Sequence, residues 1–325
     1  MVHASSVKVV DRDICGHRPL LKYVALILLL IPVAACGPSV SASGQQSMDA
    51  AFSACNQPVT PQCNITIPVG TFAFSVQVAP SATFSIQGAG ASYDNPGISS
   101  STYIEPHCLT TLVWQGGDHI PFVISSYHLH GSKLAGFCLD AVGTSPEVFI
   151  DVDKAAGNVT LDDVVIDTPN TQARVAAIRY GNTGTVIDPI CNNVFVRASA
   201  PIGFDILDVE AHFVGTHCRA VWNGVNEWVI GGGGHLVESF HCVFCSAEAR
   251  PTNIPVQINN TIGFWWSEGY LECGPVCFDI PATAVTANTV VITNSFVGGD
   301  NTPPLVRTGL ASATVSESGN YVRNP

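Results

Sequence analysis

Three charged residues recur at a regular distance along the chain: Asp151, Arg179 and Asp205, separated by 28 and 26 positions. Each stands at the centre of a short apolar run. Two carboxylates on either side of a glycosidic bond can hydrolyse it as acid and base. An arginine could instead remove the proton next to a uronate carboxylate, with a positive charge stabilising the product-like anion. Both chemistries require these three side chains to lie side by side.

A repeat of about 26 residues would bring them together. Short strand-like runs rich in Val, Ile and Phe recur between residues 150 and 308, with central residues Asp151, Arg179, Asp205, Ile230, Gln257, Asp279 and Arg307. A strand of three to five residues cannot bury its apolar face alone, but coils stacked about 4.8 Å apart form continuous parallel sheets around one core. The sequence therefore predicts an all-β fold, a right-handed parallel β-helix of about ten coils.

In such a stack the central residues point outward in one column. Asp151 and Asp205 would then be about 9–10 Å apart at the backbone, near the upper limit for an inverting acid–base pair. In a lyase, Arg179 would be the base, and the aspartates would orient the sugar or bind a divalent cation such as Ca²⁺. The alternative is a surface ladder of alternating charges without catalytic function.

A further set of aromatic and polar residues is expected to contact a substrate. Sugar rings stack on aromatic side chains, and their hydroxyl groups pair with charged or imidazole groups. The predicted outward column contains Val165, Phe195, Arg219, His241, Tyr270 and Phe296, and the substrate-binding candidates are Arg219, His241, Trp265, Glu268 and Tyr270. The alternative is that a long connection such as 119–133 covers these rings, with Phe195 buried and Tyr270 exposed.

A second series of runs ends in polar pairs that are expected to form one corner. These are Asp162-Asp163, Asn192-Asn193, Thr216-His217, Glu238-Ser239, Ser267-Glu268 and Thr293-Asn294. Asn, Ser and Thr at stacked turns satisfy backbone groups, so a structural ladder is expected there. The pair Asp162-Asp163 is the exception, because two adjacent carboxylates bring no evident structural gain.

The N-terminus contains a targeting segment. Arg18 and Lys22 precede an apolar run over 23–33 that is too short to span a bilayer. It ends in Val-Ala-Ala before Cys36, and resembles a bacterial lipoprotein signal. The resemblance implies removal of residues 1–35, lipidation of Cys36, a linker over 36–43 and a membrane-anchored protein of the cell envelope or outer surface. The alternative is an ordinary secretory signal, and either implies export.

Export decides whether the cysteines can form disulfides. Of twelve, ten remain beyond Cys15 and Cys36, and an oxidising compartment allows them to pair. Cys55 with Cys63 and Cys273 with Cys277 are candidate disulfides. Cys242 and Cys245 have no second pair at zinc-like spacing, so a structural role is expected and no metal site is predicted.

Composition excludes other functions. Only 12% of residues are charged, and the net charge is −12. Strong binding to nucleic acid needs a basic surface, so nucleic acid is not an expected partner.

The opening of the predicted domain carries a family resemblance. Residues 44–56 form an amphipathic helix pattern, followed by Ile-Thr-Ile-Pro-Val-Gly-Thr-Phe over 65–72 and Phe-Ser-Ile-Gln-Gly-Ala-Gly over 84–90. This resembles the start of the pectate-lyase superfamily. The resemblance implies a short capping helix on the apolar end of the stack and a single β-helix domain over 44–320.

The family's catalytic elements do not match. Polygalacturonase-like Asn-Thr-Asp and Arg-Ile-Lys motifs and the Arg-x-Pro-x-x-Arg motif of pectate lyases are absent from the sequence. Two hypotheses stay open: an exported lyase or glycoside hydrolase acting on an extended polysaccharide, and a non-catalytic glycan-binding or adhesion module.

Overall fold

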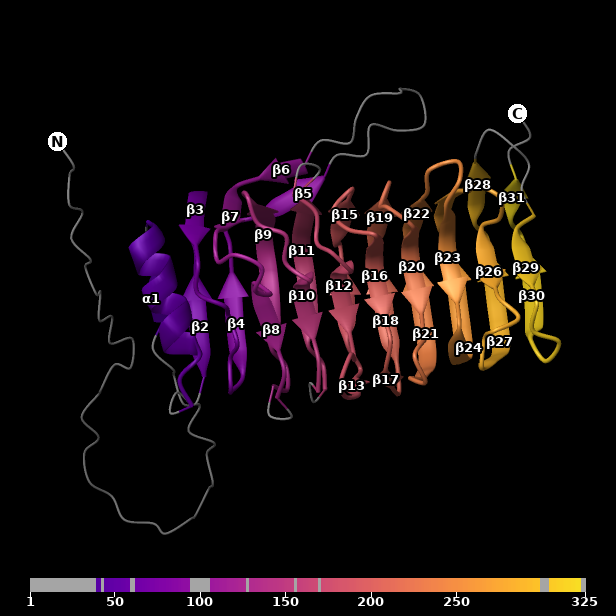
Figure 1. Cartoon of the computed structure of the whole chain (residues 1–325), viewed down its shortest axis with the longest axis horizontal. Coiled ribbons are helices and arrows are strands. Elements are labelled where there is room, and N and C mark those ends of the chain that lie inside the picture. Colours follow the sequence, from indigo (N-terminus) through magenta and orange to yellow (C-terminus); the bar gives the residue numbers. More distant parts are fainter. Residues whose placement is uncertain are drawn as a thin grey trace, which may run out of the picture.

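The structure is a computed structural model that describes residues 39–41, 44–58, 62–93, 106–126, 129–154, 157–168, 171–298 and 304–322. Short strands stack along one axis into an elongated solenoid (Figure 1). Among the strands of the described part, only β5 (Ala91–Tyr93) and β6 (Pro106–Cys108) pair antiparallel. The prediction of an all-β parallel β-helix is confirmed.

One face of the solenoid is an eight-stranded parallel sheet. Its strands are β8 (Phe122–Ile124), β10 (Val148–Val152), β12 (Ala176–Tyr180), β16 (Ile202–Ile206), β20 (Asn226–Ile230), β23 (Ile254–Ile258), β26 (Phe278–Ile280) and β29 (Val306–Thr308). The expected ten coils are too many, since this sheet has eight strands. The first coil adds none, because Val78 makes only an isolated bridge with Phe122.

The rest of each coil forms two further faces that meet at a corner. Before the corner lie β2 (Cys63–Thr66), β4 (Phe84–Gln87), β13 (Val186–Ile187), β14 (Ile190–Asn192), β17 (Val209–Glu210), β18 (Phe213–Thr216), β21 (Val237–Val243), β24 (Asn260–Ser267), β27 (Thr286–Thr293) and β30 (Thr314–Ser318). After it lie β3 (Gly70–Phe74), β7 (Thr110–Trp114), β15 (Phe195–Arg197), β19 (Arg219–Val221), β22 (Ser246–Glu248), β25 (Tyr270–Glu272), β28 (Phe296–Gly298) and β31 (Tyr321–Val322). β9 (Lys133–Ala141) and β11 (Thr160–Asp167) run through both.

The corner is a stack of left-handed residues. Asp163, Asn193, His217, Phe244, Glu268 and Asn294 all have φ between 50° and 56°. Asn and Asp tolerate this conformation best among residues with a side chain. The turn is thus repeated with the same backbone conformation on these six rungs.

The Asp162-Asp163 pair is part of this structural ladder. The Asn192 and Asn193 side-chain amides each donate to the aspartate one rung below, both at 2.6 Å. Lys133 lies 2.6 Å from the other oxygen of Asp162. The two carboxylates therefore have a structural explanation that the sequence pattern did not reveal.

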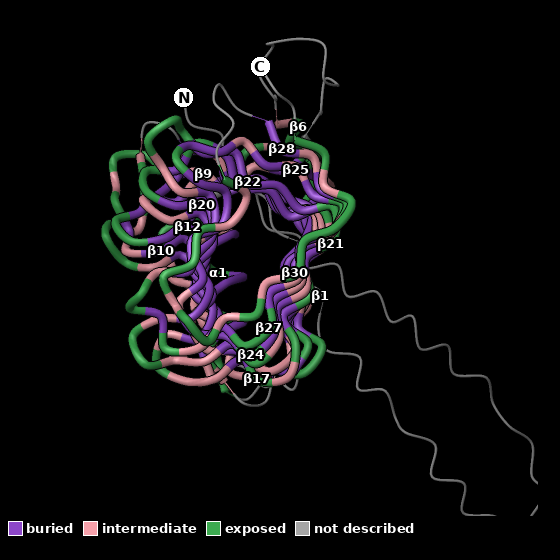
Figure 2. Tube along the Cα trace, turned by 90° about the vertical axis from the view of Figure 1, so that its right-hand side faces the viewer, coloured by how far each residue is buried: buried purple, intermediate pink, exposed green. Residues whose placement is uncertain are grey.

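Inward side chains stack rung on rung to form the core. Phe213, Phe240 and Phe264 are parallel to within 2°, with ring centroids 5.0 Å apart. Phe204 stacks on Trp228 at 4.0 Å. Figure 2, which looks along the solenoid, shows the buried residues on the inner side of the coils. Like residues at like positions give one continuous apolar column.

The predicted capping helix is present as α1 (Gln45–Cys55). Its buried side consists of Met48, Ala51, Phe52 and Cys55, the residues that the helical pattern indicated. Phe52 packs edge-on against Phe74 of β3, with centroids 5.2 Å apart. The helix thus covers the apolar end of the first coil, which would otherwise be an exposed sheet edge.

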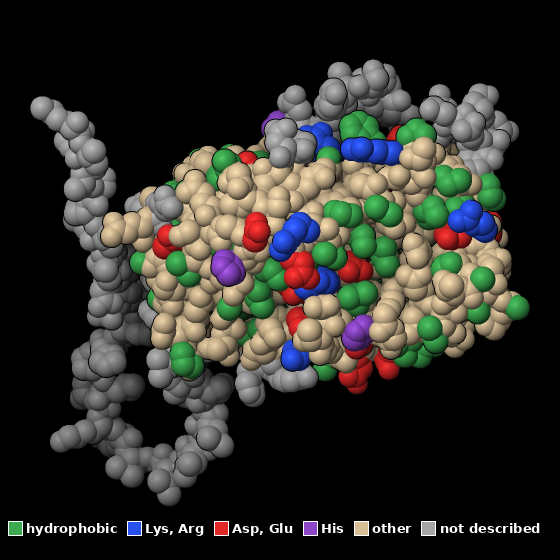
Figure 3. Space-filling view, viewed as in Figure 1, with side chains coloured by type: hydrophobic (Ala, Val, Ile, Leu, Met, Phe, Trp, Pro, Cys, Tyr) green, Lys and Arg blue, Asp and Glu red, His purple; other side chains and the backbone are tan. Residues whose placement is uncertain are grey.

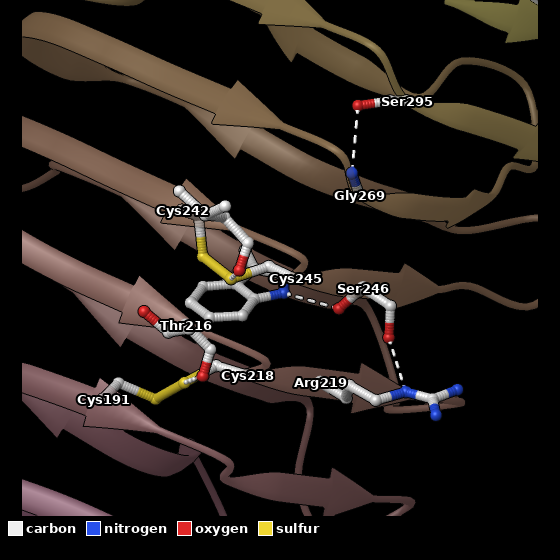
Figure 4. The surroundings of a disulfide bond; sticks show 11 residues. Cys191, Thr216, Cys218, Arg219, Cys242, Cys245, Ser246, Gly269 and Ser295 are labelled. Atoms are coloured by element: carbon white, nitrogen blue, oxygen red, sulfur yellow. Dashed lines mark hydrogen bonds between the residues drawn. A yellow bond between two sulfur atoms is a disulfide. The ribbon is translucent and has the colours of Figure 1, made fainter. Parts of the chain in front are cut away.

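All ten cysteines of the domain pair. The disulfides are Cys55–Cys63, Cys108–Cys138, Cys191–Cys218, Cys242–Cys245 and Cys273–Cys277. Both candidate pairs are confirmed, and so is a structural role for Cys242 and Cys245. Figure 4 shows two of the bridges beneath the corner, Cys191–Cys218 linking one rung to the next.

A hairpin covers part of the face after the corner. Ala91 of β5 packs with Cys138, Val165, Phe195 and Val221 in a small apolar cluster outside the main core. Cys108–Cys138 ties β6 to β9, and the hairpin lies over the N-terminal half of the solenoid (Figure 1). Phe195 is buried and Tyr270 half-buried. The expectation that Phe195 is covered is confirmed, and the cluster that buries it includes Ala91 of the hairpin.

The predicted signal over 1–35 and Cys36 lie outside the described residues. Within the predicted linker 36–43, β1 (Ser39–Ser41) pairs in parallel with β2. None of the helices in the described ranges is both long and apolar enough to span a bilayer.

Candidate functional site

The three spaced charges lie on consecutive rungs of the eight-stranded sheet. Asp151 on β10 pairs in register with Arg179 on β12, which pairs with Asp205 on β16. All three point away from the core yet are largely buried. Figure 3 shows acidic and basic side chains gathered in the middle of this face. The sequence spacing thus placed these residues correctly relative to one another.

Arg179 is fully engaged by carboxylates. Its Nε and Nη2 donate to the two oxygens of Asp151 at 3.1 and 2.9 Å, and Nη1 donates to Glu147 at 2.7 Å. Burial opposes the charge of the guanidinium, but the two carboxylates outweigh it and raise the pKa of Arg179 above its ordinary value. A bidentate pair of this kind is strong and fixed in geometry. Arg179 is therefore a poor proton acceptor.

Asp205 differs from Asp151 and Arg179, because its carboxyl group makes no hydrogen bond with any described residue. It is only 5% exposed. Burial raises the pKa of Asp205 to about 6, with Arg179 lowering it and Asp151 raising it by smaller amounts. Burial also raises the pKa of Asp151, although the hydrogen bonds from Arg179 lower it in part. Asp205 can thus hold a proton at mildly acidic pH, the property of a general acid.

The same column of outward residues continues to the end of the sheet, but one of its predicted members is wrong. Asp205 pairs with Val229, and not with the predicted Ile230. Trp228 and Ile230 both point into the core, so Val229 is the outward residue. Farther along, Asp279 accepts one hydrogen bond from Nε of Arg307 at 2.7 Å.

The residues predicted to bind substrate lie on other faces. Arg219 on β19 donates from Nε to Ser246 at 2.9 Å (Figure 4). Its Nη2 donates to Glu248 at 2.5 Å. Tyr270 on β25 donates its hydroxyl hydrogen to Glu272 at 2.5 Å. Glu248 and Glu272 pair in register on adjacent rungs, and burial raises the pKa of Glu248 despite Arg219. The sequence interpretation missed both glutamates, although each ends a similar three-residue strand.

His241 is not in the column of Arg219 and Tyr270, contrary to the prediction. Ser246 occupies that position, since it pairs with both residues. The interpretation took Glu238-Ser239 as the polar corner, but the corner residue is Phe244. His241 therefore lies before the corner, where its ring stacks on Trp265 with centroids 4.4 Å apart. Glu268 is exposed at the corner itself.

The predicted site residues are thus divided among three faces of the solenoid. In the view along the solenoid, β10, β12 and β20 form the left wall, β22 and β25 lie at the top, and β21 and β30 form the right wall (Figure 2). Residues Asp151, Arg179 and Asp205 face away from His241 and Trp265. One sugar unit cannot contact both sets.

Calcium does not fit the residues around Arg179. Calcium takes six to eight oxygen ligands. Both oxygens of Asp151 already accept hydrogen bonds from Arg179. In the part of the chain that the structure describes, no three His, Cys, Asp or Glu side chains are grouped so that they could hold a metal ion.

Comparisons with known proteins indicate the fold. No family model matches the chain, and no curated protein matches it. Among solved structures, the tailspike protein gp49 of Acinetobacter baumannii bacteriophage Fri1, a capsular polysaccharide depolymerase, is similar with a TM-score of 0.50 and 9% identity, over 88% of this chain and 60% of that one. Geobacillus virus E2 ORF18 matches with a TM-score of 0.46 and 9% identity, over 86% and 58%.

The mannuronan C-5 epimerase AlgE4 A-module of Azotobacter vinelandii is more distant, with a TM-score of 0.36 and 12% identity, over 86% of this chain and 92% of the module. The chain spans about three fifths of the length of the two phage structures. At 9% identity, the likeness to the tailspike protein shows the class of protein by fold alone: a parallel β-helix.

Proposed function

We propose that this protein acts on an extended polysaccharide lying along the outward face of the eight-stranded sheet, with Asp205 as the proton donor. The observation that carries the proposal is the state of Asp205: a largely buried carboxyl group that makes no hydrogen bond within the described part of the chain, beside an arginine that is already paired. An unpartnered buried carboxyl is costly for stability and is found where chemistry needs it. The tailspike of the same fold is named as a polysaccharide depolymerase, which agrees with a glycan substrate.

Hydrolysis fits the arrangement better than elimination. Asp205 would give its proton to the glycosidic oxygen as the bond from C1 to that oxygen breaks. Asp151, which Arg179 favours in its ionised form, would take a proton from the water that attacks C1 from the other side. Their two-rung separation of about 9–10 Å at the backbone is near the upper limit for an inverting pair. A lyase using Arg179 as base is disfavoured, because two carboxylates keep it protonated.

The test is product formation from a panel of neutral and acidic polysaccharides, followed through new reducing ends and through the absorbance of unsaturated sugars. Asp205→Asn is expected to lower the rate of reducing-end formation by about 10²–10⁴-fold. Unsaturated products, or an unchanged rate in Asp205→Asn, would contradict the proposed role.

A non-catalytic glycan-binding or adhesion role is the second candidate. The pairing of Arg179 with Asp151 and Glu147 is what a structural charge ladder requires, and this favours it. Retention of a glycan without any product, in the wild type and in Asp205→Asn alike, would support binding over catalysis.

We also propose export and lipid anchoring through Cys36. Five disulfides agree with an oxidising compartment outside the cytoplasm. Mass spectrometry of the mature N-terminus tests the anchor. Lipid on Cys36 is expected, with loss of detergent-phase partitioning in Cys36→Ser, whereas an unmodified N-terminus at another residue would indicate an ordinary secretory signal.

A further inference from the structure

A depression of about 250 Å³ lies on the outward face of β21, β24 and β27. The core residues Cys242 and Trp266 contribute to its floor, and its outward lining side chains are His241, Val243, Trp265, Ser267, Val291 and Thr293. Pockets for drug-sized ligands are usually about 300–1,000 Å³. This one suits a single sugar ring.

The position of the Trp265 ring depends on a glycine. A Cβ atom at Gly263 would lie 2.2 Å from two carbons of the indole, so the ring rests on the bare backbone two residues earlier. Its flank is stacked on His241, which accepts or donates at Nε2 with Ser239 at 2.9 Å. The indole is thus held in one orientation, half-buried, at the rim of the depression.

Free polar groups surround the same space. Trp265 Nε1 and the hydroxyls of Ser267 and Thr293 make no hydrogen bond with any described residue. Val243 and Val291 also line the depression and offer apolar contacts to a ligand. Burial, and secondarily His212, lowers the pKa of His241 and favours the neutral imidazole. Among the described residues, no Asp, Glu, Lys or Arg side chain lines the depression.

This combination matches an uncharged pyranose. A sugar ring offers apolar C–H groups to aromatic and aliphatic side chains, and its hydroxyls both donate and accept hydrogen bonds. A uronate would place its charge here without a cation to pair with, at a cost in desolvation.

We propose that this depression is a second glycan-binding site, which holds one uncharged sugar unit and anchors a polysaccharide independently of Asp205. It faces away from the eight-stranded sheet (Figure 2), so a chain held here leaves the Asp205 face open for another segment. Two such contacts on one polymer raise the overall affinity through effective concentration. The inference does not depend on any reaction at Asp205.

The test is binding of the full chain carrying Asp205→Asn to neutral polymers such as dextran, glucomannan and soluble chitin oligosaccharides, with polygalacturonate for comparison, by calorimetry and affinity electrophoresis. Trp265→Ala is expected to weaken binding of a neutral glycan at least tenfold. Gly263→Val, which displaces the ring without deleting it, should do the same. The matched control is Trp222→Ala, since Trp222 is 40% exposed and absent from this surface.

The double variant Ser267→Ala with Thr293→Val keeps the test valid if Gly263→Val does not fold. It removes two hydroxyl groups from the depression and changes the side-chain volume little. It should weaken binding severalfold with an unchanged melting temperature. The proposal is overturned if no neutral glycan binds, if polygalacturonate binds better, or if Trp265→Ala and Trp222→Ala behave alike. Product formation from short oligosaccharides with Asp205 intact reports on the other face, so its absence would count against the proposed function and not against this site.

Discussion

Two ion pairs in one column of the eight-stranded sheet have the same sequence pattern but different surroundings. Asp151–Arg179 and Asp279–Arg307 are each an Asp followed 28 residues later by an Arg, on neighbouring rungs. The Arg179 side chain is 5% exposed and bonded to two carboxylates. The Arg307 side chain is 53% exposed and makes one bond to Asp279.

The difference follows from position along the solenoid. β12 has a rung on each side, whereas β29 is the last strand of its sheet. Only the inner pair has a third carboxyl, Asp205, on the next rung. At the end of this solenoid, the Asp–Arg repeat forms an ion pair with a structural role. The same repeat is a candidate for chemistry only on the inner rungs, where neighbouring coils exclude water.

The largest expected effect comes from removing the inner arginine. Arg179→Met leaves Asp151 and Glu147 without their partner, and should lower the free energy of unfolding by about 3–5 kcal/mol. Arg307→Met, the matched control at the pair whose arginine is exposed, should change it by less than about 1 kcal/mol. Urea denaturation of both variants measures this. Equal losses would mean that burial does not distinguish the two pairs.

A carboxyl group buried inside the coil extends the comparison. Glu227 is fully buried, and Asn223 donates to it from its backbone N–H and side-chain amide. Burial raises the pKa of Glu227 to about 8. Below about pH 4.5 both folded and unfolded forms are protonated. Between there and pH 8 the unfolded chain loses the proton first, so stability falls as pH rises.

Glu227→Gln should remove most of that fall. We expect the variant to gain about 3–4 kcal/mol relative to the wild type between pH 5 and pH 8. Denaturation at several pH values tests it. A parallel decline in both proteins would show that another group is responsible.

The pH profile of any activity sharpens the contrast between Asp205 and the paired aspartates. As a general acid with a pKa of about 6, Asp205 must be protonated, so kcat/KM should fall about tenfold per pH unit above pH 6. Reducing-end assays between pH 4 and pH 9 measure it. A rate that rises through this range would instead indicate that Asp205 acts as a base.

The smallest effect is expected at the outer aspartate. Asp279→Asn removes one partner of an exposed arginine, so stability should change by less than about 1 kcal/mol and product formation by less than twofold. The same assays as for Asp205→Asn apply. A loss of activity comparable to Asp205→Asn would move the candidate site toward the C-terminal end of the sheet.

The sequence by itself determined the coil, its capping helix and the adjacency of Asp151, Arg179 and Asp205. These follow from local patterns, because short apolar runs at a near-constant period have few ways to bury their faces. Cys55–Cys63 and Cys273–Cys277 followed from proximity in the chain in the same way.

Only the tertiary structure decided which residues share a column where coil length varies, and which outward residues are covered. The corner at Phe244 places His241 on another face than predicted, and Phe195 is buried in an outer cluster with Ala91, Cys138, Val165 and Val221. Glu147, the third member of the inner cluster, comes from a loop that no repeat describes. Register and burial are set by insertions and by neighbouring coils, and these contacts are not encoded in any single repeat.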